Sequence, residues 1–458
     1  MMNLALNLDQ LKITYKSIHP PSSPVNPVLP FVTKTVVELK GGFDELVGEY
    51  VRQICGNTTQ AQQKQKDELE FEDPLILQLT SQIEFNTEVQ EDLERFLRHF
   101  LFGTNRSMNV FHPYIYNYLP APEKDSLRKC AAFISDVLVE GDQAVAEIFR
   151  DKQADDLLTE LILENLKVVS ASRKDKGKHQ GLLPFLSSLY REDLLYMNKH
   201  RDYFLSHFSL LTHFYAFNYI CQLLFKFERF IEADYSQATP LYFALEWETL
   251  SKRRKATEGL GYRAIKEKLP HLFVHVHTMT QLSMLSDTED QPFITYVELD
   301  KRLELDQDRA NFVDSLNQWI LEYAKKFPLN GEDESFRTYN ELGEAMEGLF
   351  KRVQKGVNQE AAVKYGRNLS GFGGKTFIKS RSSLGQVFNM TQEMLLLLTA
   401  VCVKDTRMPL NKLFVEFAKR GVDFDRLSKK AIIELFDALN ILDKKSDSGD
   451  AQYVKPIL

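Results

Sequence analysis

The stretch YFLSHFSLLTHFYAFNYICQLLF, residues 203–225, constrains the fold more than any other part of the sequence, because its 23 residues carry no formal charge. A segment of this length is long enough to span a membrane. However, serine, threonine, histidine, asparagine and glutamine side chains interrupt it, and Asp202 and Lys226 flank it directly. We therefore expect a buried helix in a large domain, and no membrane contact.

The composition indicates a folded chain in a reducing compartment. The 458 residues suffice for about two to four domains. The four cysteines are scattered without a Cys-x-x-Cys pair, which argues against a disulfide framework or a zinc knuckle. The opening residues include Asp9 among apolar neighbours and do not resemble a signal peptide. We therefore expect a cytoplasmic protein.

Apolar spacing along the chain predicts a mainly α fold, with a multi-helical body and a C-terminal winged helix-turn-helix-like unit. The expected segments are an extended Pro-rich arm with a short helix and a linker (1–68), an N-terminal helical region (69–180), a central helical domain (181–365), a basic Gly/Ser-rich loop (366–388) and a winged-helix-like domain (389–458). The formal net charge of −7 means that any site for a polyanion must be a local basic patch.

The expected loop contains the sequence GGKT, which is the end of a phosphate-binding Walker loop. That motif requires a glycine five residues before Gly374, but the residue there is Leu369. The motif also follows a buried strand and opens a helix, whereas the residues before this one have the pattern of a helix end. We expect no nucleotide and no other cofactor here.

The charge of the same region is more informative. No acidic residue occurs between Glu360 and Glu393, although the chain as a whole is acidic. The basic residues of this interval are Lys364, Arg367, Lys375, Lys379 and Arg381. Glycines that allow a close approach and serine or threonine hydroxyls accompany them, and these groups together contact phosphate oxygens in DNA complexes. The alternative is a solvated basic loop without a ligand.

The last seventy residues, from Asn389 onward, predict three helices followed by a β-hairpin. We expect Asn389 to cap the first helix, with Gln392 at its third position. This order is that of a winged helix-turn-helix, whose third helix reads the major groove. The candidate DNA contacts of this unit are Arg426, Lys429 and Lys430 on the third helix, with Lys444 and Lys445 on or beside the wing. The alternative is a module for protein contacts, because the unit is nearly neutral.

The sequence gives only weak signals for catalytic or metal-binding residues. His275 and His277 stand two residues apart and would share one face if they lay on a strand, but no third metal ligand is evident nearby. The triplet Glu298-Leu299-Asp300 approaches a nuclease motif, but its lysine follows one position late. We therefore expect a protein that is not an enzyme and holds no metal.

Two C-terminal stretches, SRSSLGQVFNMTQEMLLLLTAV and FAKRGVDFDRLSKKAIIELFDALNILDKKSDSGDAQYVKPIL, closely resemble the DptG (DndG) family. Its members are the G subunits of bacterial DNA-phosphorothioation-dependent restriction systems. The stretches LDQLKITY and LPFVTK also resemble that family's N-terminal region, whereas the middle of the chain resembles it only faintly. The resemblance implies an anti-phage protein that works with the motor-like subunits DptF and DptH on DNA without backbone sulfur.

The sequence thus predicts a non-catalytic subunit that binds double-stranded DNA and scaffolds the restriction complex. The basic loop and the third helix should form one surface for phosphates. The main alternative is a pure assembly factor that docks the motor subunits without touching DNA. A less favoured alternative is a nuclease built on helical carboxylates that no motif reveals.

Overall fold

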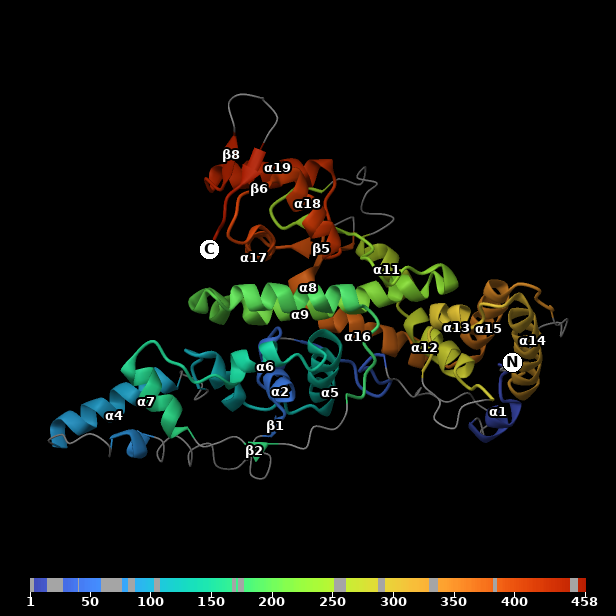
Figure 1. Ribbon diagram of the computed structural model, residues 1–458, viewed down its shortest axis with the longest axis horizontal. Coiled ribbons are helices and arrows are strands. Elements are labelled where there is room, and N and C mark those ends of the chain that lie inside the picture. The colour runs from blue at the N-terminus through green and yellow to red at the C-terminus, as the bar shows by residue number, and fades with distance from the viewer. Residues whose placement is uncertain are drawn as a thin grey trace.

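The computed structural model describes residues 4–14, 28–39, 41–58, 76–80, 87–102, 108–166, 170–171, 177–250, 261–286, 293–328, 337–381, 385–444 and 452–458. These residues are mainly helical, which confirms the prediction of a mainly α fold (Figure 1). Among the described residues, no helix combines the length and apolar character needed to cross a membrane.

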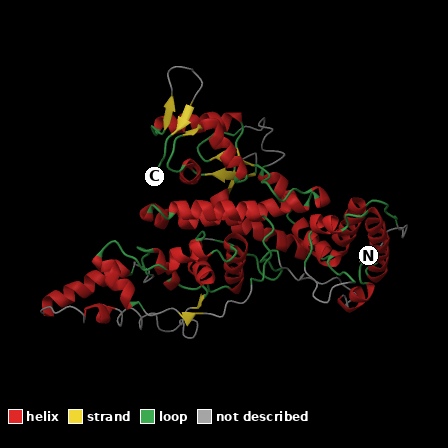
Figure 2. Cartoon of the chain, in the orientation of Figure 1, coloured by secondary structure: helices red, strands yellow, loops and turns green. Residues whose placement is uncertain are grey.

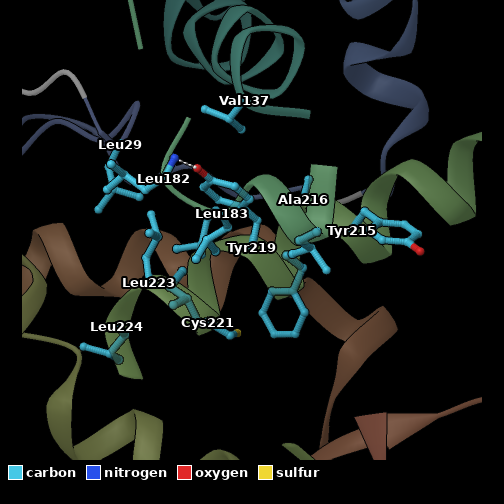
Figure 3. Packing of buried hydrophobic residues seen from close by; sticks show 14 of the residues in the cluster. Leu29, Val137, Leu182, Leu183, Tyr215, Ala216, Tyr219, Cys221, Leu223 and Leu224 are labelled. Carbon is cyan, nitrogen blue, oxygen red and sulfur yellow. Dashed lines mark hydrogen bonds between the residues drawn. The ribbon is translucent and has the colours of Figure 1, made fainter. Parts of the chain in front are cut away.

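The uncharged stretch lies in the long helix α9, Arg201–Phe227, which runs through the middle of the molecule (Figure 1). From Leu211 to Phe227 every residue of α9 is buried, because other elements pack on all sides of it. Figure 3 shows part of this packing, where the Leu182 backbone N–H donates to the Tyr219 hydroxyl at 2.8 Å. The prediction of a central buried helix is confirmed.

Elements from the first 171 residues lie mostly below α9 in Figure 1. They are α1 (Leu8–Thr14), α2 (Asp44–Cys55), β1 (Asn57–Thr58), α4 (Thr87–Leu101), η2 (Pro113–Tyr118), α5 (Asp125–Ile134), η3 (Ser135–Val139), α6 (Gln143–Arg150), α7 (Leu157–Asn165) and β2 (Ser170–Ala171). Strands β1 and β2 pair antiparallel. Helices α4 and α7 share a small apolar core with η2, separate from the main one.

The middle of the chain forms the helices around and beside α9. The elements are α8 (Pro184–Met197), η4 (Phe230–Glu232), β3 (Leu241–Leu245), α11 (Tyr262–Lys268), α12 (His271–Leu282), α13 (Tyr296–Arg302), α14 (Asp306–Lys326), α15 (Leu342–Gly356) and α16 (Gln359–Phe377). The main apolar core runs from Leu6 to Val454, so N-terminal, central and C-terminal segments contribute to one cluster.

The C-terminal elements lie above α9, where most of the strands gather (Figure 2). They are β4 (Ile378–Ser380), β5 (Gln386–Met390), α17 (Gln392–Val403), β6 (Met408–Pro409), α18 (Leu410–Lys419), β7 (Val422–Asp423), α19 (Arg426–Ala438), β8 (Leu442–Lys444) and β9 (Gln452–Val454). One sheet has the order β4-β5-β3-β7, in which β3 is parallel to both β5 and β7. The other has the order β6-β9-β8 and is antiparallel.

Two local predictions are wrong. Residues 366–381 and 385–388 are not a loop, because α16 continues to Phe377 and the paired strands β4 and β5 follow. Asn389 does not cap α17: it lies in β5, and the Thr391 hydroxyl accepts the cap bond from the Met394 N–H at 3.1 Å. His275 and His277 lie on α12, within the range predicted to be helical, so they do not share one face of a strand.

Candidate nucleic-acid interface

Three glycines at the end of α16 face the protein interior. A Cβ at Gly366 would lie 2.4 Å from the Leu269 carbonyl oxygen, and one at Gly371 would lie 1.9 Å from that of Val37. A Cβ at Gly373 would lie 2.4 Å from the Phe217 ring. These glycines therefore allow helix packing within the chain, and they are not available to bring the backbone close to DNA.

The fourth glycine, Gly374, has φ +52° and ψ −149°, a conformation that breaks the helix there. This kink turns the chain into β4 and leaves Lys375 exposed. A cavity of about 450 Å³ lies at this corner. Its lining residues are Ser370, Gly374, Lys375, Ile378, Lys379, Ser380 and Gln386. Two ammonium groups, two hydroxyls and one amide therefore surround the cavity.

The two lysines of the cavity differ in their partners. Within the described residues, Lys375 pairs with no carboxylate. The Lys379 Nζ lies 2.6 Å from the Glu246 Oε1, and both side chains are about two-fifths exposed. An exposed pair of this kind is weak, so a phosphate can compete with Glu246 for the ammonium group.

Ser370 is fixed by the interior of the protein. Its hydroxyl lies 2.6 Å from that of Tyr262, and burial raises the pKa of this tyrosine, so that it stays protonated at neutral pH. The phenol can donate to Ser370, and the Ser370 hydroxyl can then donate into the cavity. The cavity therefore offers hydrogen-bond donors besides its two cations.

Arg381, predicted to contact DNA, instead holds the turn after β3. Its Nη2 donates to the carbonyl oxygens of Leu245 at 3.0 Å and Glu246 at 2.7 Å. Its Nε is buried, with no hydrogen-bond partner in the described part of the chain. This guanidinium is committed to the fold, so it does not serve as a free phosphate contact.

An acidic turn separates the cavity from helix α19. The turn contains Glu246, Trp247 and Glu248, and Trp247 is 42% exposed. Glu246 binds Lys379, while the Glu248 carboxylate accepts a hydrogen bond from the Ser428 hydroxyl at about 3.0 Å. The predicted single basic surface is therefore interrupted by two carboxylates, which repel phosphate.

The basic residues of helix α19 differ in whether a carboxylate pairs with them. The Asp425 carboxylate caps it by accepting from the Leu427 and Ser428 N–H groups. Lys429 pairs with Asp423 at 3.0 Å and lies over the Phe414 ring, and Lys430 lies 3.8 Å from Glu434. Only Arg426, among the described cations predicted on this helix, is exposed without a carboxylate partner.

The other predicted contacts are scattered. Lys364 pairs with Glu360 one turn away on α16, at 2.9 Å. Arg367 is exposed and has no carboxylate partner in the described residues. Lys444 ends β8, but its side chain and all of Lys445 lie outside the described residues. The structure thus brings only Lys375 and Lys379 together in one cavity.

Of the residues considered for metal binding and nuclease chemistry, His275, Glu298 and Asp300 have structural partners, whereas His277 Nε2 has no hydrogen-bond partner among the described residues. His275 bonds to the Tyr296 hydroxyl at 2.9 Å and to the Glu228 carboxylate at 3.1 Å. Glu298 forms the capping box of α13 with Thr295, and Asp300 pairs with Arg309 at 2.7 Å. In the described ranges, no three histidine, cysteine or acidic residues form a group that could hold a metal.

The sequence analysis did not identify Glu246 or Glu248. Their carboxylates bind Lys379 and Ser428 and lie between the cavity and α19. They lie 133 and 180 residues from Lys379 and Ser428, and no local pattern links such distant positions. The sequence shows only the triplet Glu246-Trp247-Glu248, and the exposure of Trp247 becomes visible only in the structure. A scan against protein-family models finds no match to this chain, and a search of curated proteins finds none either.

Proposed function

We propose that this chain is a non-catalytic DNA-binding and scaffolding subunit of a phosphorothioation-dependent restriction complex that acts on unmodified DNA. The observation that carries DNA binding is the cavity at the end of α16, where Lys375 and Lys379 meet the Ser370 and Ser380 hydroxyls. Ammonium and hydroxyl donors of this kind hold DNA through its phosphate oxygens, without reading sequence. The assignment to this complex rests on the resemblance of residues 380–458 to the DptG (DndG) family.

The C-terminal elements support a winged helix-turn-helix. The order α17, β6, α18, β7, α19, β8, β9 contains the three helices and the final hairpin of that architecture. Strands β6, β9 and β8 form one sheet, and β7 pairs with β3 in the other. In this proposal α19 is the recognition helix, and Arg426 and Lys430 near its start contact the duplex. The cavity and α19 then make separate contacts on either side of the Glu246–Glu248 turn.

A specific observation favours a second candidate, the pure assembly factor. Four of the eight predicted cations whose side chains are described pair with carboxylates, and Arg381 binds backbone carbonyls. Leu427, beside Arg426 at the start of α19, is 59% exposed, which suits a protein contact better than a phosphate contact. In this candidate the same helix docks DptF or DptH.

Duplex-DNA binding across a salt series separates the two candidates. The protein should bind with an affinity that falls steeply as salt increases, because each neutralised phosphate contributes about −0.9 to the log–log slope. The variant Lys375→Ala/Lys379→Ala should lose roughly tenfold in affinity near physiological salt, and its slope should flatten by about 1.8. Arg426→Ala/Lys430→Ala tests α19 in the same way.

The matched control is Lys325→Ala/Lys351→Ala, which removes two exposed, carboxylate-paired lysines from α14 and α15. It should bind DNA like the unaltered protein. A parallel series with phosphorothioate in the duplex tests whether this subunit discriminates modified DNA. If binding did not depend on salt, or if all variants had the same log–log slope, the proposed DNA contact would be wrong. The assembly factor would then be the better candidate.

A further inference from the structure

A second, larger groove lies beside the first half of α9, and none of the predicted DNA contacts lines it. It measures about 820 Å³, within the usual range of ligand-binding clefts. Its walls come from the start of α2, the connection from η2 to α5, the first half of α9, and the junctions at Thr376 and Glu393. About half of its lining is apolar, and includes Phe43, Val110, Tyr116, Leu119, Leu205 and Leu210.

The charged residues of this groove are nearly all acidic. Asp44, Glu45, Glu123 and Glu393 line it, against the single cation Lys124. None of the four carboxylates forms an ion pair within the described residues. Asp44 accepts a hydrogen bond from the Ser209 hydroxyl, and Glu45 accepts one from the Gly41 N–H at 2.5 Å. The groove therefore holds an excess of negative charge without an internal counter-ion.

His213 adds a further acceptor to the lining. This residue is 2% exposed, and its Nε2 lies 2.8 Å from the Phe372 carbonyl oxygen, which can only accept. Burial lowers the pKa of His213 to about 4, so the ring is neutral and its Nδ1 carries a lone pair. Among the described residues, no hydrogen bond joins Nδ1 to another group. This nitrogen can therefore accept a hydrogen bond from a group bound in the groove.

We propose that this groove binds an amphipathic basic segment of a partner protein, with lysine or arginine side chains on the carboxylates and apolar side chains on the leucine-lined wall. The carboxylates exclude nucleic acid, because they repel phosphate. A simple polyamine would satisfy the carboxylates but leave the apolar half of the lining uncovered. A chain that alternates cationic and apolar side chains satisfies both.

The groove and the cation cavity share the last turn of α16. Thr376 lines the groove, and its neighbour Lys375 lines the cavity. A partner bound in the groove would therefore lie next to the proposed DNA contact without occupying it. The docking proposal does not depend on DNA binding, since its residues and its test are separate.

The test uses two labelled peptides of about twelve residues, one of alternating leucine and lysine and one of alternating leucine and glutamate. Fluorescence anisotropy with the full-length protein should show binding of the lysine peptide alone. The variant Asp44→Asn/Glu123→Gln/Glu393→Gln should weaken it roughly tenfold or more, by loss of three charge contacts. Carbodiimide cross-linking followed by mass spectrometry should join the peptide's lysines to Asp44, Glu123 or Glu393.

The control Glu147→Gln/Glu164→Gln/Asp314→Asn makes the same change in net charge at exposed carboxylates outside the groove. It should bind the lysine peptide like the unaltered protein. Equal weakening in both triple variants, or cross-links only outside the groove, would overturn the proposal. Displacement of the peptide by an equal concentration of spermine would also overturn it, because the site would then recognise charge alone.

Discussion

At the scale of single residues, the absence of a side chain decides how α16 packs. Gly371 lets the helix lie against the Val37 carbonyl, and the Leu39 N–H donates to the Gly371 carbonyl oxygen at 3.2 Å. About one turn earlier, the side-chain amide oxygen of Asn368 binds the same segment by accepting from the Val37 N–H at 2.7 Å. The segment around residues 37–39 is thus joined to α16 through contacts that only a glycine permits.

The substitution Gly371→Ala should destabilise the protein by about 3 kcal/mol, because the new methyl group overlaps a backbone atom that cannot move alone. Gly356→Ala is the matched control, since a Cβ there meets only the Tyr323 hydroxyl at 3.8 Å. That change should be neutral or stabilise by up to about 1 kcal/mol through helix propensity. Urea denaturation measures both, and equal effects would contradict the packing role of Gly371.

At the scale of elements, a buried ion pair fastens the C-terminal unit to the helical body. Arg420, after α18, binds Asp193 of α8 through two bonds of 2.7 and 2.6 Å. The Tyr215 hydroxyl of α9 donates to the same carboxylate at 2.5 Å. Both charged side chains are almost fully buried, so their pairing depends on α8, α9 and α18 meeting in one place.

Asp193→Asn should cost about 3 kcal/mol of unfolding free energy, since it leaves the buried guanidinium with only the longer 3.3 Å pair to Glu416. The neighbouring change Glu192→Gln removes an exposed pair with Lys404 and should cost under about 1 kcal/mol. The double change Asp193→Leu/Arg420→Met should be milder than Asp193→Asn. Denaturant unfolding, together with limited proteolysis of the C-terminal unit, measures the loss of stability in each variant. A small loss in Asp193→Asn would mean that apolar packing alone joins the C-terminal unit to the helical body.

At the scale of the whole molecule, the aromatic core encloses histidines that fold in their neutral form. Burial lowers the pKa of His213 and of His277 to about 4. His277 Nε2 has no hydrogen-bond partner among the described residues, whereas His213 bonds to the Phe372 carbonyl. Because the unfolded chain binds these protons near pH 6.5 and the folded chain does not, acid favours unfolding.

Stability should therefore fall as the pH drops from about 6.5 to 4, by about 3 kcal/mol for each of these two histidines, and this loss should end below pH 4. The variant His277→Leu should lack one of the two contributions, so its stability should depend less on pH. Met279→Leu on the same helix is the control and should keep the full acid loss. Denaturant titrations at several pH values measure the effect, and an unchanged slope in His277→Leu would contradict it.

Local patterns in the sequence were sufficient for the type and place of many elements. The uncharged run predicted the central helix α9, and the C-terminal periodicity predicted α17, α18, α19 and the β8–β9 hairpin. Leu369, where a Walker loop needs glycine, excluded that motif. These features depend on residues within a few turns of each other, so the sequence alone determined them.

The tertiary structure decided what those elements do. It turned the glycines of α16 inward, paired β3 with β5 and β7, and placed Glu246 on Lys379 and Asp193 on Arg420. Each of these contacts joins segments that are distant in the chain. The charge of a side chain does not indicate which distant residue will pair with it. In the sequence, Lys375 and Lys379 are equally basic. In the folded chain Lys379 pairs with Glu246, whereas Lys375 has no carboxylate partner among the described residues.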